Sequence, residues 1–147
     1  MSNAGVSLNP SYGGPVGTFA LVDSTCLRPH EQVDEDRLER LAQEIARDGV
    51  LREPVLVDSR SLVILDGHHR VQVLRSLGCN MIPVYLVDYY SPAVQVRSWR
   101  EGVRVDKDSV LQRGLSQTPF PPRTSRHTVS VMLPPRPVSL SLLIARL

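Results

Sequence analysis

The 147-residue chain contains only two cysteines, and this scarcity excludes several classes of small domain. Cys26 and Cys79 lie far apart in the sequence and neither belongs to a CxxC motif, so neither a disulfide framework nor a zinc knuckle is supported. No apolar run reaches the roughly 18 residues of a membrane span, and the N-terminus lacks the basic-then-apolar order of a signal peptide. We therefore expect a cytoplasmic protein with no membrane partner, in which both cysteines are small buried filler.

Acidic residues are absent from the C-terminal part of the chain. The last one is Asp108, and all but one of the 17 basic residues of the chain are arginines. The formal net charge of +2 is too small to indicate nucleic-acid binding by itself, so nucleic acid is disfavoured as a partner. A wholly basic C-terminal segment instead suits an anionic ligand. Its arginines are Arg113, Arg123, Arg126, Arg136 and Arg146.

The length favours one domain, because a chain of this size builds one hydrophobic core rather than two. Residues 1–17 are small, polar and rich in glycine and proline, so we expect a flexible leader or tag there. Residues 18–147 are expected to form the single domain. Within it, prolines are frequent from residue 118 to residue 140. Because proline has no amide hydrogen to donate, this segment is unsuited to a β-ladder or a long helix. Residues 119–147 are therefore predicted to form an extended wrap over the surface.

Strands and helices alternate along the chain without an internal repeat. The clearest helix has Leu38, Leu41 and Ile45 on one stripe and a glycine at its end. The continuous apolar run from Leu62 to Leu65 predicts a strand that is buried on both faces. We predict an α+β (mixed α/β) fold with a small mixed sheet flanked by helices. The predicted strands are 19–23, 54–58, 62–67, 82–89 and 93–99, and the predicted helices are 34–49, 68–77 and 106–117.

The stretch LDGHHRVQVLRSLG carries the strongest sign of a ligand site. A predicted strand ends at Leu65, Gly67 allows a tight turn, and a helix follows at once, so the free amides of its first turn form an anion site. His68, His69 and Arg70 add donors suited to phosphate, and Asp66 is placed to hold a metal ion or a ligand hydroxyl. The alternative is purely structural: Asp66 caps the helix, the histidines are exposed and Arg70 forms a nearby salt bridge.

Two further polar clusters and the only tryptophan interrupt otherwise ordinary sequence. RPHEQ, residues 28–32, places His30 and Glu31 in a loop ahead of the first helix, and RTSRH occupies residues 123–127. All four histidines of the chain lie in these clusters or in DGHHR, but their spacing is not that of a zinc site. For Trp99 the sequence favours a place in the hydrophobic core and a place in the wall of a pocket equally.

DGHHR, RPHEQ, LVDYYSPAVQVRSW and RTSRH together resemble the free L-serine kinases of the ParB/sulfiredoxin-like superfamily. The resemblance runs from Phe19 to Trp99 and resumes from Pro121 to Pro135. It implies a compact ParB/sulfiredoxin-like catalytic domain that binds a nucleotide and free L-serine. The implied reaction is Mg²⁺-dependent phosphoryl transfer from ADP or ATP to the serine hydroxyl, which gives O-phospho-L-serine.

The resemblance also implies residue roles. Glu31 corresponds to the general base, and Asp66 lies near the transferred group, where it can hold Mg²⁺ through the phosphates. The residues implied to bind the nucleotide phosphates are Gly67, His68, His69 and Arg70. Those implied to bind serine are Trp99, Thr124, Ser125, Arg126 and His127, with Arg126 pairing with the serine carboxylate.

Other functions within the superfamily are weighed against this one. A sulfiredoxin needs a cysteine at the position held by His68, which excludes that activity. A DNA-partition protein normally adds a helix-turn-helix region, for which the proline-rich segment is unsuited. A nucleotide-binding regulatory module without catalysis is the remaining alternative. The serine kinases carry a longer segment where residues 100–120 stand here, and a homo-oligomer is compatible with the sequence.

Overall fold

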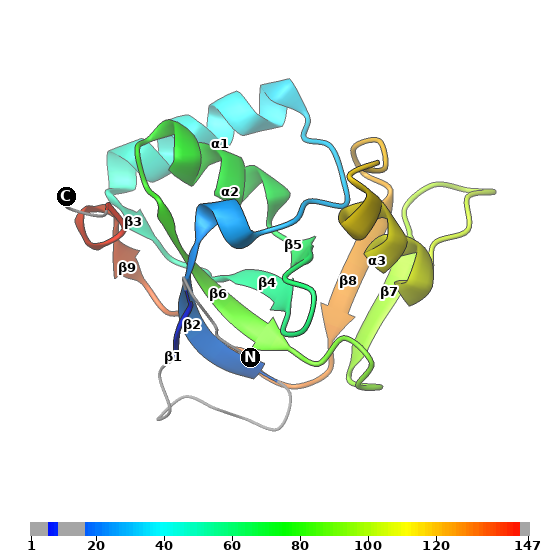
Figure 1. Cartoon of the computed structure of the whole chain (residues 1–147). Helices are drawn as coiled ribbons and strands as arrows, with labels where there is room; N and C mark the ends of the chain where they lie inside the picture. Colours follow the sequence, from blue (N-terminus) through cyan, green and yellow to red (C-terminus); the bar gives the residue numbers. More distant parts are fainter. Residues whose placement is uncertain (1–5, 9–16, 145–147) are drawn as a thin grey trace.

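The computed structural model describes residues 6–8 and 17–144, which fold around a mixed five-stranded sheet (Figure 1). The strand order is β1-β2-β6-β4-β5. Only β4 and β6 pair in parallel, and every other neighbouring pair in this sheet is antiparallel. The sheet is therefore mixed, as the alternation of elements predicts. Its strands are β1 (Val6–Leu8), β2 (Gly17–Asp23), β6 (Met81–Val87), β4 (Val55–Asp58) and β5 (Ile64–Asp66).

Two helices lie side by side over one face of the sheet, and a third lies at the opposite end of the molecule (Figure 1). Helix α1 (Glu35–Asp48) begins after Asp34, whose carboxylate accepts hydrogen bonds from the amides of the first turn. Helix α2 (His68–Ser76) follows β5 directly, and α3 (Lys107–Ser116) starts with a capping box. With 14 residues, α1 is the longest helix in the described part of the chain, and none there is long and apolar enough to cross a membrane.

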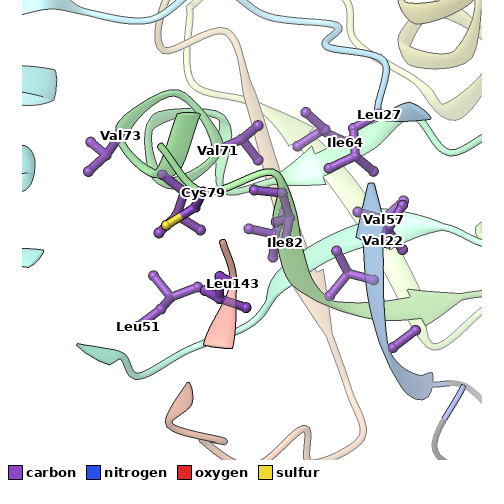
Figure 2. Close-up of a cluster of buried hydrophobic side chains, with 14 of the residues drawn as sticks. Val22, Leu27, Leu51, Val57, Ile64, Val71, Val73, Cys79, Ile82 and Leu143 are labelled. Atoms are coloured by element: carbon purple, nitrogen blue, oxygen red, sulfur yellow. The ribbon is translucent and has the colours of Figure 1, made fainter. Parts of the chain in front are cut away.

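Both faces of the sheet are buried, because the strand side chains alternate between two cores. Val22, Ile64 and Ile82 point to the core under α1 and α2, where Cys79 and Leu143 complete the packing (Figure 2). The prediction of a strand buried on both faces is thus confirmed for Ile64 and Leu65, whereas Leu62 precedes the strand, is only partly buried and has a φ of 60°. The core on the opposite face consists of Phe19, Leu56, Val63, Leu65, Tyr85, Val87, Tyr89, Val94, Val110 and Phe120.

The proline-rich segment forms a β-ladder, although its proline content predicts an extended wrap instead. Strand β8 (Ser125–Val129) pairs antiparallel with β7 (Val94–Ser98), so that Ser125 lies opposite Ser98. The ladder is accessible because residues 123–133 contain no proline, so every backbone amide there can donate. Only the flanking parts behave as a wrap: the chain then crosses to β9 (Val138–Ser139), which pairs with β3 (Val50–Leu51).

The predicted leader also differs from the structure. Val6–Leu8 forms strand β1 on the edge of the sheet, and β2 already begins at Gly17, so part of the segment is structured. The rest of that prediction falls on residues 1–5 and 9–16, which lie outside the described residues, as do residues 145–147. Short 3-10 helices, Ser24–Cys26 and Leu140–Leu142, complete the structure. Cys26 is partly buried against the core that contains Cys79.

The contact between Gly114 and Val63 yields a test of the packing of α3. A Cβ at residue 114 would stand 2.7 Å and 2.8 Å from the methyl groups of Val63, which is fully buried and cannot move aside. Helix propensity favours Gly114→Ala by about 1 kcal/mol, but overpacking costs about 1 to 3 kcal/mol. We expect a net loss of about 1 kcal/mol in the free energy of unfolding, measured by urea denaturation.

Gln112→Ala is the matched control, because Gln112 is exposed on the same helix. It should change the free energy of unfolding by no more than about 0.5 kcal/mol. A gain of stability in Gly114→Ala would show that helix propensity, rather than the contact with Val63, decides the outcome.

Candidate active site

A cavity of about 780 Å³ opens where β5 ends, and it is large enough for a small-molecule ligand. Its wall combines α1, the first turn of α2 and the end of the β7–β8 pair. It brings together ten of the eleven residues predicted for the site and omits only Thr124. The ten are Glu31, Asp66, Gly67, His68, His69, Arg70, Trp99, Ser125, Arg126 and His127.

The first turn of α2 faces this cavity without a side-chain cap. Gly67 precedes the helix in the left-handed region, with φ of 110°, and no side chain accepts from the amides of the first turn. The structural alternative, in which Asp66 caps the helix, is therefore wrong, and the side chain of Asp66 is 67% exposed. The φ of residue 67 requires glycine, and a Cβ there would also lie 2.8 Å from the guanidinium of Arg70 and displace it.

Arg70 is held against the protein. Its Nη1 donates to the carbonyl oxygens of Glu53 and Pro54, at 2.8 Å and 2.9 Å. Its Nη2 lies 3.7 Å from a carboxylate oxygen of Asp66, so the nearby salt bridge of the structural alternative is present. Because Nη1 is bound to these carbonyl oxygens, the guanidinium has fewer N–H groups left for a bidentate hydrogen bond. Its contribution to anion binding in the cavity is therefore mainly its positive charge.

His68 and His69 both anchor the loop that precedes α1. Nε2 of His68 accepts from the amide of His30 at 3.1 Å, and Nε2 of His69 accepts from the amide of Asp34 at 3.0 Å. Because an amide can only donate, both Nε2 atoms are unprotonated and each neutral ring carries its proton on Nδ1. Burial lowers the pKa of both histidines, that of His68 more strongly. The alternative of two exposed histidines is therefore wrong.

Glu31 is bound from the other side of the cavity by the start of β8. Its Oε1 accepts from the amide of Ser125 at 2.8 Å, from the hydroxyl of Ser125 at 2.9 Å and from the amide of Thr124 at 3.2 Å. The backbone supports the same junction, since His30 and Gln32 exchange hydrogen bonds with Phe120. One carboxylate oxygen is thus saturated with donors, which orients the carboxylate within the cavity wall.

Thr124 does not present its hydroxyl to the cavity. The residue is 1% exposed, and its Oγ1 donates to the carbonyl oxygen of Pro121 at 2.7 Å. The prediction that its side chain contacts the substrate is not supported by this arrangement. Its position places the backbone amide on Glu31, so the residue supports the site rather than lining it.

Trp99 is a wall of the cavity and not part of a core. Its side chain is 58% exposed, and the guanidinium carbon of Arg126 lies 4.7 Å from the centre of its ring. The amide of Trp99 donates to the carbonyl oxygen of Thr124 at 2.9 Å, which extends the β7–β8 pairing by one residue. A cation–π contact of this kind holds Arg126 at the cavity while leaving its N–H groups able to bind an anion.

His127 lies deeper than its neighbours on β8. Its Nε2 is 2.8 Å from the hydroxyl of Tyr89, and its Nδ1 is buried without a hydrogen-bond partner in the described residues. Burial lowers the pKa of His127 to about 3, so the ring is neutral near pH 7. It therefore meets a ligand as an uncharged hydrogen-bonding group.

Several residues of the site were missed by the sequence analysis. Arg37 and Arg40 of α1 line the cavity, and their i, i+3 spacing on one helix face was the available signal. With Arg70, Arg123 and Arg126 they make five arginines in the wall. His30 was noticed in its motif but given no role, although it is fully buried and contacts Ser125.

No group of three or more histidine, cysteine, aspartate or glutamate side chains able to hold a metal occurs among the described residues. Asp66 still fits Mg²⁺, which binds through one or two carboxylates together with substrate phosphates. Its exposed carboxylate opens on the cavity beside the uncapped turn of α2.

Acidification should destabilise the fold because the buried ring of His127 resists protonation. Its pKa is about 3 in the native state, whereas a histidine in the unfolded chain titrates near ~6.5. Between these values the unfolded chain binds more protons, so stability that is fully present above about pH 6.5 is lost as the pH falls. His127 alone should cost about 2 kcal/mol at about pH 5. Thermal unfolding by circular dichroism at several pH values measures the loss.

In this experiment His127→Asn should show a weaker dependence on pH than the parent protein. Thr128→Ala, an exposed neighbour on β8, should keep the full dependence. Equal pH dependence in all three proteins would show that His127 does not carry the effect.

The chain matches curated relatives over part of its length, as two of them illustrate. A ParB-like protein of Sulfolobus acidocaldarius is 40% identical over 80 residues, which are 54% of this chain and 40% of that protein. An ADP-dependent L-serine kinase of Thermococcus kodakarensis is 29% identical over 115 residues, covering 74% of this chain and 48% of the relative. The chain thus spans less than half the length of either relative.

The fold is shared with a solved structure of a free serine kinase in complex with AMP. The TM-score is 0.77 at 16% sequence identity, and the match covers 86% of this chain and 93% of that one. This likeness confirms the mixed α+β fold. The model of the ParB N-terminal domain matches residues 18–98. Because that match covers more than half of the 147 residues, the chain belongs to the ParB N-terminal domain family.

Proposed function

We propose that the protein is a small-molecule kinase that transfers a phosphoryl group from ADP or ATP to the hydroxyl of free L-serine. The observation that carries this proposal is the position of Glu31. Its carboxylate is held by three donors in the wall of the same cavity that receives the uncapped first turn of α2. A carboxylate base facing an anion site is the arrangement that phosphoryl transfer to an alcohol requires.

The side of the cavity formed by α1 and α2 suits the nucleotide phosphates. The amides of the first turn of α2 have no side-chain cap, and the positive end of the helix dipole lies there. Arg37 and Arg40 face the same cavity from α1, and Arg70 adds a third positive charge. Phosphoryl transfer depends chiefly on positioning and on neutralising phosphate charge, which these groups supply. The N–H groups on Nδ1 of His68 and His69 are the remaining donors we assign to phosphate.

The side formed by β7 and β8 suits the amino acid. Arg126 lies over Trp99 and is exposed, so its guanidinium can pair with the carboxylate of serine. His127 offers a neutral ring beside it, and Ser125 holds Glu31 in place. In this assignment Thr124 acts only through its backbone.

The reaction then needs few protein groups. Glu31 accepts the proton of the serine hydroxyl, whose oxygen forms a bond to the terminal phosphorus of the nucleotide. The bond from that phosphorus to its bridging oxygen breaks, which leaves O-phospho-L-serine and AMP from ADP, or ADP from ATP. Mg²⁺ bound by Asp66 and the phosphates would neutralise charge on the phosphoryl group.

Three further expectations from the sequence stay predictions. They are a cytoplasmic location, the absence of nucleic acid as a partner and a homo-oligomeric state.

The second candidate is a nucleotide-binding regulatory or DNA-partition-related module without transfer chemistry. The 40% identity to a ParB-like protein favours it. The two candidates differ in a product, so phosphorus NMR of the protein with magnesium, L-serine and either nucleotide distinguishes them. We expect phosphoserine from the parent protein and a loss of at least about 100-fold in rate for Glu31→Gln, because the amide cannot accept the proton.

Glu31→Gln keeps an oxygen that can accept the same three hydrogen bonds, so nucleotide binding by calorimetry should be retained. Glu39→Gln on the exposed side of α1 is the control for the charge change. Nucleotide binding without phosphoserine from either donor would support the regulatory module and overturn the kinase.

Arg126→Ala tests the amino-acid side of the site. Losing a charged hydrogen-bonding partner costs about 1.5 to 3 kcal/mol, so the KM for serine should rise about 10-fold to 100-fold. The KM for the nucleotide should change little, since Arg126 lies on the opposite side of the cavity from α1. Steady-state kinetics with each substrate varied measures both constants.

Arg97→Ala is matched to this variant, because Arg97 lies opposite Arg126 in the β7–β8 ladder and does not line the cavity. It should keep the KM for serine. An unchanged KM for serine in Arg126→Ala would remove Arg126 from the serine site.

A further inference from the structure

His30 is the most deeply buried polar residue near the cavity, yet it does not line it. The residue is 0% exposed, and its ring packs edge-on against the rings of His68 and His127, with centres 4.6 Å and 5.6 Å away. Its two ring nitrogens contact Ile64 and Ser125. A buried imidazole that binds no substrate calls for a role through its neighbours.

The proton on the ring of His30 can be placed from its contacts. Nδ1 lies 2.5 Å from the carbonyl oxygen of Ile64, which can only accept, so Nδ1 carries a proton. Burial lowers the pKa of His30 and outweighs the opposing hydrogen bond to Ile64 and the charges of Glu31 and Asp66. The other titratable groups packed around it, His68 and His127, are themselves held neutral by burial. The ring is therefore neutral, and Nε2 is an acceptor.

The hydroxyl of Ser125 consequently lies between two acceptors. Its Oγ is 2.7 Å from Nε2 of His30 and 2.9 Å from Oε1 of Glu31. A hydroxyl has one proton, and it cannot donate fully to both acceptors at once. While Glu31 is a carboxylate, donation to Glu31 is the stronger hydrogen bond because the acceptor is charged.

We propose that His30 is a positioning residue that acts through Ser125 to adjust the strength of Glu31 as a base. When Glu31 takes up the proton of serine, the Ser125 hydroxyl rotates to Nε2 of His30 and keeps a hydrogen bond. Without His30 the hydroxyl would lose a good acceptor at that moment, which would oppose proton transfer to Glu31. The rotation exchanges one hydrogen bond for another and changes no covalent bond. The inference rests on the proposed function, since it concerns the base of that reaction.

The proposal predicts that replacing His30 and replacing Ser125 shift the pH dependence of catalysis in opposite directions. In His30→Asn the hydroxyl of Ser125 has no imidazole acceptor once Glu31 is protonated, which disfavours the protonated form relative to the carboxylate. The acid limb of the pH profile for kcat/KM should then move to lower pH by about one unit. In Ser125→Ala the carboxylate loses a donor, so the limb should move to higher pH by about the same amount. A residue that served only to maintain the fold would not shift the limb in a defined direction.

The experiment measures this pH profile for the parent protein, both variants, Ser125→Thr and the exposed control Thr128→Ala. Ser125→Thr restores a hydroxyl and should return the limb to its position in the parent protein. Thr128→Ala should leave the limb unmoved. Limbs that coincide in the parent protein, His30→Asn and Ser125→Ala, or that move in the same direction in both variants, would overturn the proposal.

A second measurement is independent of turnover. The side-chain carboxyl carbons of the glutamates are isotope-labelled and titrated by carbon NMR, with the Glu31 signal assigned by its absence in Glu31→Gln. The midpoint should move down in His30→Asn and up in Ser125→Ala. If His30→Asn does not fold, an unmoved midpoint in Ser125→Ala overturns the proposal by itself. If the parent protein makes no phosphoserine, the proposed function fails while this titration still decides the coupling.

Discussion

The hydrogen bonds on one oxygen of Glu31 are the interaction on which the rest of the site depends. They join the loop before α1 to the start of β8, which is separated from it by 94 residues in the chain. One wall of the cavity consists of α1, which follows the loop, and α2, which is hydrogen-bonded to it. The other wall consists of β8 and its partner strand β7. Together with the backbone hydrogen bonds of Phe120 to His30 and Gln32, this junction helps to fix the wall formed by β7 and β8 relative to the wall formed by α1 and α2.

Neutral histidines provide the second constraint, because they connect the same loop to α2. His68 and His69 accept from backbone amides of the loop, and an imidazole can do so only while that nitrogen is unprotonated. Burial makes the charged form costly, which keeps the acceptors available near neutral pH. Much of the DGHHR motif therefore builds the site by holding the loop before α1 in place.

Elements with strong local patterns were predicted closely from the sequence. Helix α1 follows the stripe of Leu38, Leu41 and Ile45, and α2 starts one residue after Gly67 as expected. The strands that were missed have weaker local patterns: β1 has three residues, β3 and β9 have two each, and β8 lies between proline clusters. Strand β8 forms because β7 offers it a partner, which is information that the residues of β8 do not contain.

The sequence by itself determined the uncapped first turn of α2, because a glycine directly before a helix has no side chain that could accept from the first amides. It also supplied the residues that match a serine kinase, through motifs that are each continuous. Only the tertiary structure decided which atoms of those motifs face the cavity. Thr124 turns inward to Pro121, Arg70 is held by backbone carbonyls, and His30 lies behind Ser125. These outcomes depend on hydrogen bonds between segments that are distant in the chain, and the spacing of residues within one motif does not specify them.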